Sequence, residues 1–177
     1  MAVERGAFTL AEIMSQPDIW VKAVEVFNQH QDAFKSFCSA GHFSHLLLTG
    51  CGSTHYAAQI GAALIQQFAG FSARAYPASE IALLPDFALA QGGTPLLIAV
   101  SRSGETSETI EAARVFRQRT NQPVVAVTCA GSSTLAAQAD LNIAIDVAQE
   151  RSIAQTRSFA SMVAVRLAAR LKLDHAE

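Results

Sequence analysis

The chain has 177 residues and a mass of 18.8 kDa, which fits one ordinary domain and leaves little room for two. Half of the residues are hydrophobic, 16% are charged and the mean hydropathy is +0.23, so a sizeable core can form and intrinsic disorder is excluded. The 13 basic residues are scattered and 15 acidic residues oppose them, which argues against nucleic-acid binding.

Membrane, disulfide and metal signals are also missing from the sequence. The apolar runs are too short to span a membrane, and Glu4 and Arg5 precede any hydrophobic stretch, unlike a signal peptide, so we expect a cytoplasmic protein with no membrane partner. Cys38, Cys51 and Cys129 form an odd set without C-x-x-C spacing, which predicts reduced thiols. The five histidines lack ligand spacing with carboxylates, so we expect no metal site.

The apolar pattern changes its period along the chain. A short turn is expected at 9–15 and a helix over 18–38, with Pro17 where a first helical turn tolerates proline. Short apolar runs bounded by Gly, Pro, Ser or Asn predict strands at 45–49, 95–100, 123–128 and 141–147, and a weaker one at 72–76. Helix-forming segments lie at 55–69, 79–84, 106–119, 133–139 and 157–172. Continuous apolar strands are typical of a parallel sheet buried on both faces.

Alternating strands and helices predict an α/β fold, a three-layer αβα sandwich. We interpret residues 1–40 as a helical leader and 41–177 as a single domain. The helix at 55–69 is apolar nearly all round, so it is expected to be buried on both sides. It is either a central helix of the domain or a helix at a subunit interface, and we predict dimerisation.

Two loops follow predicted strands at the edge where parallel sheets bind ligands. In the first, Gly52, Ser53 and Thr54 offer a close backbone approach and hydroxyl groups. A glycine turn with a Ser/Thr helix cap is the other interpretation. Because His55 replaces the third glycine of a dinucleotide motif and the loop has no P-loop lysine, we expect no nucleotide cofactor.

The second loop carries the stronger signal. Ser101, Arg102, Ser103, Gly104 and Thr106 combine three hydroxyls, a flexible glycine and a cation just before a helix. Free N–H groups at a helix N-terminus bind phosphate, so the spacing favours a phosphate site. Capping of the helix by Ser103 or Thr106 is the alternative, and it accounts for only one hydroxyl.

A third segment, 149–159, runs from the last predicted strand into the last helix. Glu150 would lie at the same edge as the two loops, either as a general base or as a solvated loop carboxylate. Gln155 and Thr156 either meet sugar hydroxyls or cap the helix. Cys51 has no visible activator except His55, which favours a packing role over a nucleophile.

These motifs, in this order, resemble the sugar isomerase (SIS) domain family. The segments are Gly50-Cys-Gly-Ser-Thr54, Ser101-Arg-Ser-Gly-Glu-Thr106 and Glu150-Arg-Ser-Ile-Ala-Gln-Thr-Arg-Ser-Phe159. The chain looks like the first SIS copy of tandem proteins such as the tagatose-6-phosphate ketose/aldose isomerase group and the isomerase half of glucosamine-6-phosphate synthase. The resemblance implies a five-stranded parallel, flavodoxin-like SIS fold that binds phosphosugars.

By the same resemblance, residues of all three segments contact the ligand. The phosphate loop matches Ser101, Arg102, Ser103 and Thr106, a hydroxyl position matches Thr54, and the sugar lining matches Ala154 and Gln155. The synthase has serine where this chain has Gln155, so the sugar specificity is open.

The implied activity is aldose/ketose isomerisation of a hexose or amino-hexose 6-phosphate by proton transfer between C1 and C2. Glu150 would be the base, with Glu105 a distant second, and a sugar phosphate and a homodimer or higher homo-oligomer would be the partners. Two alternatives are kept: a phosphosugar sensor without catalysis, and an inactive first half of a tandem enzyme. The half-enzyme alternative follows from tandem family members, in which a second SIS copy carries a glutamate base and a lysine.

Overall fold

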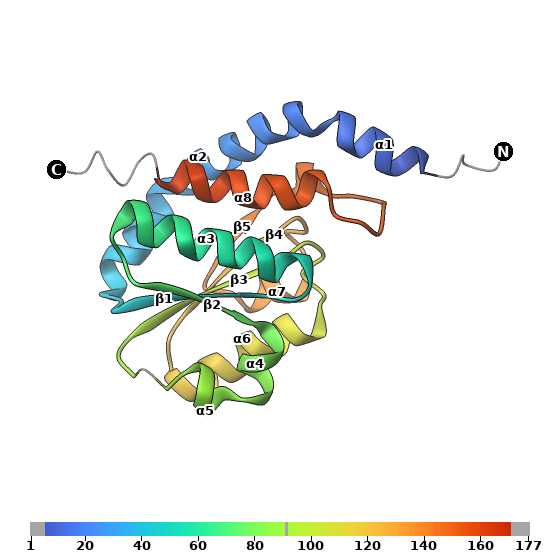
Figure 1. Ribbon diagram of the computed structural model, residues 1–177. Helices are drawn as coiled ribbons and strands as arrows, with labels where there is room; N and C mark the ends of the chain where they lie inside the picture. The colour runs from blue at the N-terminus through green and yellow to red at the C-terminus, as the bar shows by residue number, and fades with distance from the viewer. Residues whose placement is uncertain (1–5, 91, 171–177) are drawn as a thin grey trace.

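A five-stranded parallel sheet is the centre of the molecule (Figure 1). The computed structural model describes residues 6–90 and 92–170. The strands are β1 (His45–Gly50), β2 (Ala73–Pro77), β3 (Pro95–Ser101), β4 (Val124–Thr128) and β5 (Leu141–Ala144). Their order is β2-β1-β3-β4-β5, and all four pairings are parallel. The predicted α/β fold is confirmed.

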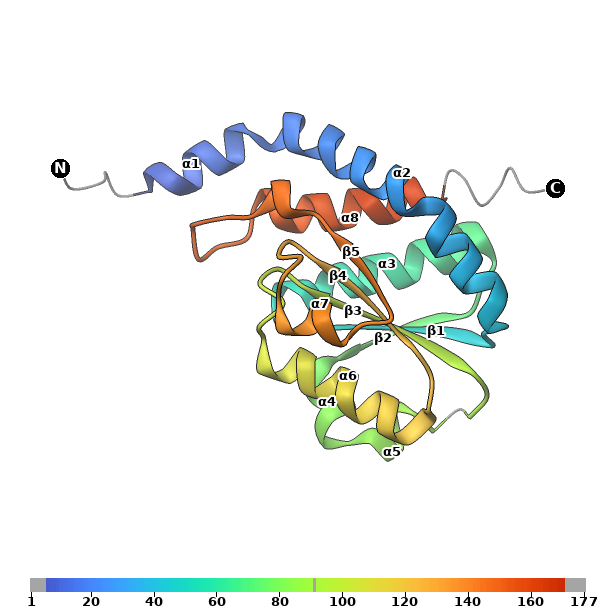
Figure 2. The same cartoon turned by 180° about the vertical axis from the view of Figure 1, so that it is seen from behind.

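Helices cover both faces of this sheet (Figures 1 and 2). One face carries α2 (Gln16–Gly41), α3 (Ser53–Ala69) and α8 (Arg157–Arg170). The other carries α4 (Ala78–Leu83), α5 (Pro85–Ala88), α6 (Ser107–Thr120) and α7 (Thr134–Gln138). The helix α1 (Ala7–Met14) and the 3-10 turn η1 (Asp146–Ala148) complete the elements.

The core is split into two layers by the alternation of side chains along each strand. Leu46 and Leu48 of β1 pack with Phe27 of α2, whereas Leu47 between them packs with Phe116 of α6. All residues of β1, β3 and β4 are buried, as their continuous apolar sequences predict.

Several boundaries differ from the sequence-based expectations. The segment expected as a turn at 9–15 is the helix α1, and Ser15 keeps helical dihedrals (φ −81°, ψ −7°), so α2 follows almost without a break. Strand β5 ends at Ala144 because Ile145 (φ −101°, ψ 59°) leaves the extended conformation before η1. The helix α5 was not expected. Positions 171 and 172 of the last predicted helix lie outside the described residues.

Helix α3 is buried on one side only. Thr54, Ala58 and Ala62 are buried beneath it. On its outer side Tyr56 is 62% exposed and Ile60 is 39% exposed. The alternative of a central helix covered on both sides by the chain itself is therefore wrong, because the outer face has no cover among the described residues, and the alternative of a subunit interface stays a prediction.

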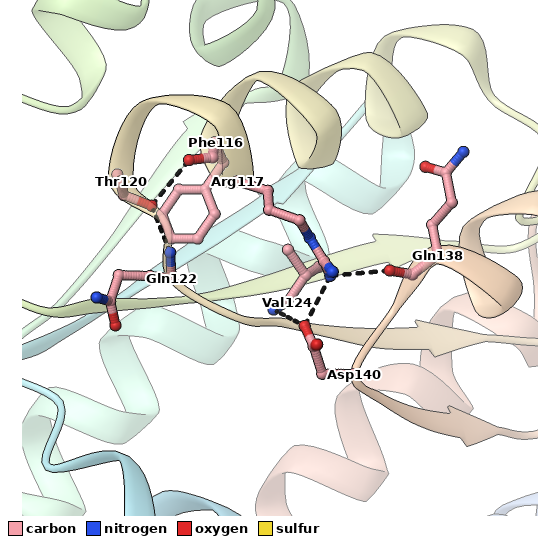
Figure 3. A network of polar contacts seen from close by, with 7 residues as sticks. All are labelled: Phe116, Arg117, Thr120, Gln122, Val124, Gln138 and Asp140. Carbon is pink, nitrogen blue, oxygen red and sulfur yellow. Dashed lines mark hydrogen bonds and ion pairs between the residues drawn. The ribbon is translucent and has the colours of Figure 1, made fainter.

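A polar network ties the amino-terminal end of β4 to its neighbours (Figure 3). Asp140, just before β5, accepts hydrogen bonds from the backbone N–H of Val124 at 2.8 Å and from Arg117 of α6 at 2.7 Å. Arg117 also donates to the Gln138 carbonyl at 2.9 Å. The Asp140 carboxylate thus accepts the hydrogen bond of the Val124 N–H at the start of β4, where β5 has not yet begun. Through Arg117 it also holds α6 and the end of α7 at this end of the sheet.

Candidate active site

The chain reverses its direction of winding between the two central strands. From β1 it moves outward to β2, and β3 then returns to the other side of β1. Loops 50–54 and 101–106 leave the carboxyl ends of β1 and β3, and so lie on either side of this switch point. Open α/β sheets bind ligands at such a point.

Loop 101–106 is held in shape by its own hydrogen bonds. The buried Ser101 Oγ accepts from Gly104 N at 3.0 Å and lies 3.3 Å from Thr106 Oγ1. The loop carbonyls also serve neighbouring elements, because Arg102 O accepts from Cys129 N at 3.1 Å and Gly104 O accepts from Leu135 N at 3.0 Å. The loop is therefore formed before any ligand binds.

The same loop presents backbone N–H groups at the start of α6. Those of Ser103, Thr106 and Ser107 have no acceptor among residues 6–90 and 92–170. Thr106 is the N-cap residue, yet its side chain makes no capping hydrogen bond, and Ser103 Oγ accepts only from Glu105 N at 3.2 Å. Unpaired N–H groups at a 14-residue helix form a site suited to an anion.

Gly104 is required by the tight packing of this loop against α7. Its φ is +66°, in the left-handed region that favours glycine. A Cβ at this position would lie well inside 3.0 Å of the Ser133 side chain, closer than real Cβ atoms come. Ser133 in turn caps α7 by accepting from Ala136 N at 3.4 Å.

In loop 50–54, two predicted site residues are exposed and one is inside. Thr54 is buried, and its hydroxyl donates to Cys51 O and accepts from Cys51 N, each at 3.0 Å. Gly52 (φ +57°, ψ −125°) and Ser53 are exposed at the start of α3. Thr54 therefore holds the turn, whereas Gly52 and Ser53 face outward where a ligand can reach them.

The segment 149–156 is joined to loop 101–106 through Arg102. The Arg102 guanidinium donates to the carbonyls of Ser152 at 3.0 Å and Ile153 at 3.3 Å. Ala154 is exposed, and the side-chain oxygen of Gln155 is buried without a hydrogen-bond partner in the structure. Buried polar atoms are usually paired, so Gln155 has an open hydrogen-bonding position.

Both oxygens of Glu150 are occupied by the chain itself. One accepts from Thr156 N at 2.7 Å and from the Thr156 hydroxyl, and the other accepts from the Ser158 hydroxyl. Glu150 thus caps the first turn of α8. In this conformation the carboxylate orients the loop rather than offering a free oxygen.

Glu105 is also committed to a neighbouring helix. It accepts from Thr134 N at 2.8 Å and from the Thr134 hydroxyl at 2.7 Å. These two hydrogen bonds lower the pKa of Glu105 against a small opposing effect of burial. The side chain therefore stays ionised and connects loop 101–106 to the start of α7.

Sequence reasoning missed a third carboxylate, Glu12 of α1. It is 4% exposed and accepts from Arg151 N at 2.6 Å, from Ser152 N at 3.4 Å and from the Ser152 hydroxyl. Burial by itself would raise the pKa of Glu12, but these hydrogen bonds and the nearby Arg157 charge outweigh it and lower the pKa. No local motif marks Glu12, since its partners lie about 140 positions away.

Other reactive groups give no second centre within the part of the chain that the structure describes. Cys129 is buried, and burial together with the Glu150 charge raises the pKa of its thiol to about 12. No cluster of three or more His, Cys, Asp or Glu residues there has a metal-binding arrangement, and no helix is long and apolar enough to cross a membrane. His55, at the start of α3, keeps a buried Nδ1 atom without a partner.

The SIS domain family model matches residues 42–172, most of the chain. The chain belongs to the SIS family. The recognition from its three motifs is confirmed.

Relatives and solved structures agree with this assignment. The chain is 25% identical over 170 residues to the glutamine–fructose-6-phosphate aminotransferase (isomerizing) of Chlamydia caviae, covering 94% of this chain and 27% of that protein. The tagatose-6-phosphate ketose/aldose isomerase of Escherichia coli has a similar fold, with a TM-score of 0.83, 23% identity, and coverage of 96% of this chain and 49% of that one.

A second similar solved structure is closer to this chain in length. It is a protein of E. coli CFT073 solved in complex with a ligand, with a TM-score of 0.71, 21% identity, and coverage of 98% of this chain and 92% of that one. The SIS chain therefore spans about a quarter of the aminotransferase, half of the tagatose-6-phosphate isomerase and nearly all of this ligand-bound structure.

Proposed function

We propose that this SIS chain binds a sugar phosphate, with the phosphate in loop 101–106 and the sugar toward loops 50–54 and 149–156. The observation that carries the proposal is the preformed loop with unpaired N–H groups of Ser103, Thr106 and Ser107 at the start of α6. A phosphate dianion satisfies such groups and gains from the helix dipole. Arg102, a residue of the same loop, adds a positive charge.

The remaining predicted residues take roles that follow from their positions. Ser101 and Thr54 hold their loops, because their hydroxyls are bonded inside them. Ser103 and Ser53 are exposed and offer hydroxyls to the ligand. Gln155, with its unpaired buried oxygen, is the candidate for a sugar hydroxyl. No cofactor is part of the proposal, and the proposed setting is the cytoplasm.

Isothermal calorimetry tests the binding. We expect fructose 6-phosphate, tagatose 6-phosphate or glucosamine 6-phosphate to bind, and unphosphorylated fructose to bind at least tenfold more weakly. Ser103→Ala and Thr106→Ala should each weaken binding about three- to tenfold, as expected for one lost hydrogen bond. Thr120→Ala is the matched control, because its hydroxyl bonds Phe116 O at the far end of α6. Equal affinity for fructose and its phosphate contradicts the proposal.

Isomerisation is the proposed reaction of this site. A base removes the proton from C2 of the aldose or C1 of the ketose, and the carbonyl oxygen takes up a proton to give the enediol. The other carbon is then protonated while its neighbour's hydroxyl loses a proton and becomes the new carbonyl. Glu150 can act as this base only after it releases Thr156 or Ser158. Interconversion of the sugar phosphates, followed by NMR, should be lost in Glu150→Gln with the Kd unchanged. Unchanged turnover in Glu150→Gln removes this residue from the mechanism.

One observation favours a second candidate, binding without catalysis by this chain alone. The three carboxylates that touch the candidate loops, Glu12, Glu105 and Glu150, each accept two or more hydrogen bonds from the protein. A sensor needs no free base, whereas an isomerase does. Micromolar binding without turnover supports the sensor, and restoration of turnover by an added second SIS copy supports the half-enzyme.

A homodimer or higher homo-oligomer is proposed through the outer face of α3. Its exposed Tyr56 and Ile60 are the apolar groups that a second copy would cover. Sedimentation at micromolar concentration should give a dimer that Ile60→Asp weakens. A monomer at the same concentration contradicts the proposal.

A further inference from the structure

Helix α1 lies along the segment that leads into α8 (Figures 1 and 2). Two side-chain contacts besides those of Glu12 hold it there. The Arg151 guanidinium lies 4.1 Å from the centre of the Phe8 ring, and Arg157 donates to Ser15 Oγ at 3.1 Å. The helix is thus fastened near both of its ends, to Arg151 of segment 149–156 and to Arg157 at the start of α8.

Glu12 makes the central contact of this arrangement. Its carboxylate is buried and accepts the N–H of Arg151, the N–H of Ser152 and the Ser152 hydroxyl. A buried charge is tolerated when it is fully hydrogen-bonded, and removal of its charge leaves the donors without an equal acceptor. The position of Ser152 therefore depends on Glu12.

Ser152 is also the residue that meets the candidate phosphate loop. Its N–H and hydroxyl turn toward Glu12, whereas its carbonyl accepts from Arg102 at 3.0 Å. The next carbonyl, that of Ile153, accepts from the same Arg102 nitrogen at 3.3 Å. One short stretch of backbone thus connects the buried carboxylate of α1 to Arg102, the cation of loop 101–106.

We propose that Glu12 is a positioning residue of the phosphosugar site: it fixes residues 151–153, and these hold the Arg102 guanidinium beside the phosphate. The proposal rests on the proposed function, since it assumes that loop 101–106 binds phosphate. Glu12 acts through Ser152 and Arg102 and does not touch the ligand. The helix α1, expected from the sequence as a turn ahead of the domain, thereby becomes part of the binding site.

A double-mutant cycle on the full chain tests this role, with fructose 6-phosphate as the probe in calorimetry. Glu12→Gln keeps the shape of the side chain but turns one acceptor into a donor. We expect it to raise the Kd about tenfold, and Arg102→Ala to raise it by at least as much. In the double variant the Kd should equal that of Arg102→Ala alone. A merely structural role of Glu12 would weaken binding by the same factor in both backgrounds.

Two further variants keep the test decisive. Glu111→Gln neutralises an exposed carboxylate that pairs with Arg114 on α6, and it should leave the Kd unchanged. Ser152→Ala removes the hydroxyl that Glu12 accepts but keeps the carbonyl that Arg102 uses, so it should raise the Kd about threefold even if Glu12→Gln folds poorly. An unchanged Kd in a folded Ser152→Ala protein, together with additive effects in the cycle, overturns the proposal.

Amide hydrogen exchange without ligand separates the two possible failures. Glu12→Gln should speed exchange at Arg151 and Ser152, while Glu111→Gln should not. If the wild-type chain binds none of the three sugar phosphates, the proposed function fails and the role of Glu12 in ligand binding fails with it, whatever the exchange shows. If the wild type binds and Glu12→Gln binds equally well, only the role of Glu12 is overturned.

Discussion

Gly104 is the residue of the candidate phosphate loop whose substitution has the most sharply defined cost. With φ at +66°, an alanine there pays about 1–2 kcal/mol for the left-handed backbone. Its methyl group would also overlap the Ser133 side chain, and overpacking of this kind adds about 1–3 kcal/mol. We therefore expect Gly104→Ala to lower the free energy of unfolding by about 2–5 kcal/mol.

Gly70 is the matched control because it shares the left-handed backbone of Gly104 but a methyl group there would overlap no neighbour. It ends α3 with a φ of +60°, and a Cβ at this position meets no atom within 4 Å. Gly70→Ala should therefore cost about 1–2 kcal/mol. Urea unfolding followed by circular dichroism measures both values, and calorimetry with fructose 6-phosphate should show weaker binding for Gly104→Ala alone, since the loop must move.

A second substitution isolates the overlap. In Gly104→Ala/Ser133→Gly the side chain that blocks the new methyl group is gone, and glycine in place of a serine N-cap costs only a few tenths of a kcal/mol. The double variant should be more stable than Gly104→Ala. The steric argument is refuted if the double variant is no more stable, or if Gly104→Ala and Gly70→Ala unfold at the same urea concentration.

Three further outcomes follow from individual contacts. The pKa of Glu12 is lower in the folded protein than its ordinary value of 4.5, so the ionised carboxylate stabilises the fold above pH 4.5. This stabilisation is lost as the pH falls through the folded pKa. The difference in Tm between wild type and Glu12→Gln should therefore shrink from pH 6 to pH 3. Cys129, with a thiol pKa of about 12, should not react with iodoacetamide at pH 8 until the protein is unfolded in urea. Labelling of Cys129 in the native protein would contradict its burial. Asp140→Ala should lower the free energy of unfolding in urea by about 1–3 kcal/mol, because the N–H of Val124 loses its acceptor. Asp140→Asn keeps an acceptor oxygen and should lower it less. If both variants lose the same amount, the effect belongs to the ion pair of Asp140 with Arg117.

The sheet could be predicted from the sequence because its signal is local. The runs at 45–49 and 95–100 have apolar centres and are followed by glycine or serine loops, and the strands begin where those runs begin. The end of β5 could not be read in this way, because Ile145 is apolar and buried and yet leaves the strand for η1. Hydrophobicity indicates burial, and only backbone dihedrals separate a strand from the turn after it.

The sequence indicated where the candidate loops lie, but not which hydrogen bonds their side chains make. The motif at 101–106 indicated a compact loop before a helix, and the structure has one. The hydroxyl of Thr54 was assigned outward but is bonded to Cys51, which the motif does not indicate. The burial and the partners of Glu12 could not be predicted, since a carboxylate in an apolar helix looks like a solvated residue and its partners lie in segment 149–156.

The hydrogen bonds of Glu12 also bear on the order in which the molecule assembles. They join residues 139 and 140 positions apart, near opposite ends of the described chain. Contacts that close so long a stretch of chain are slow to form, and during synthesis α1 leaves the ribosome well before its partners exist. Arg102 therefore receives the carbonyls of Ser152 and Ile153 only when segment 149–156 is in place. Binding of a sugar phosphate would then report on completion of the fold, and a nascent or partly folded chain would not yet compete for the ligand.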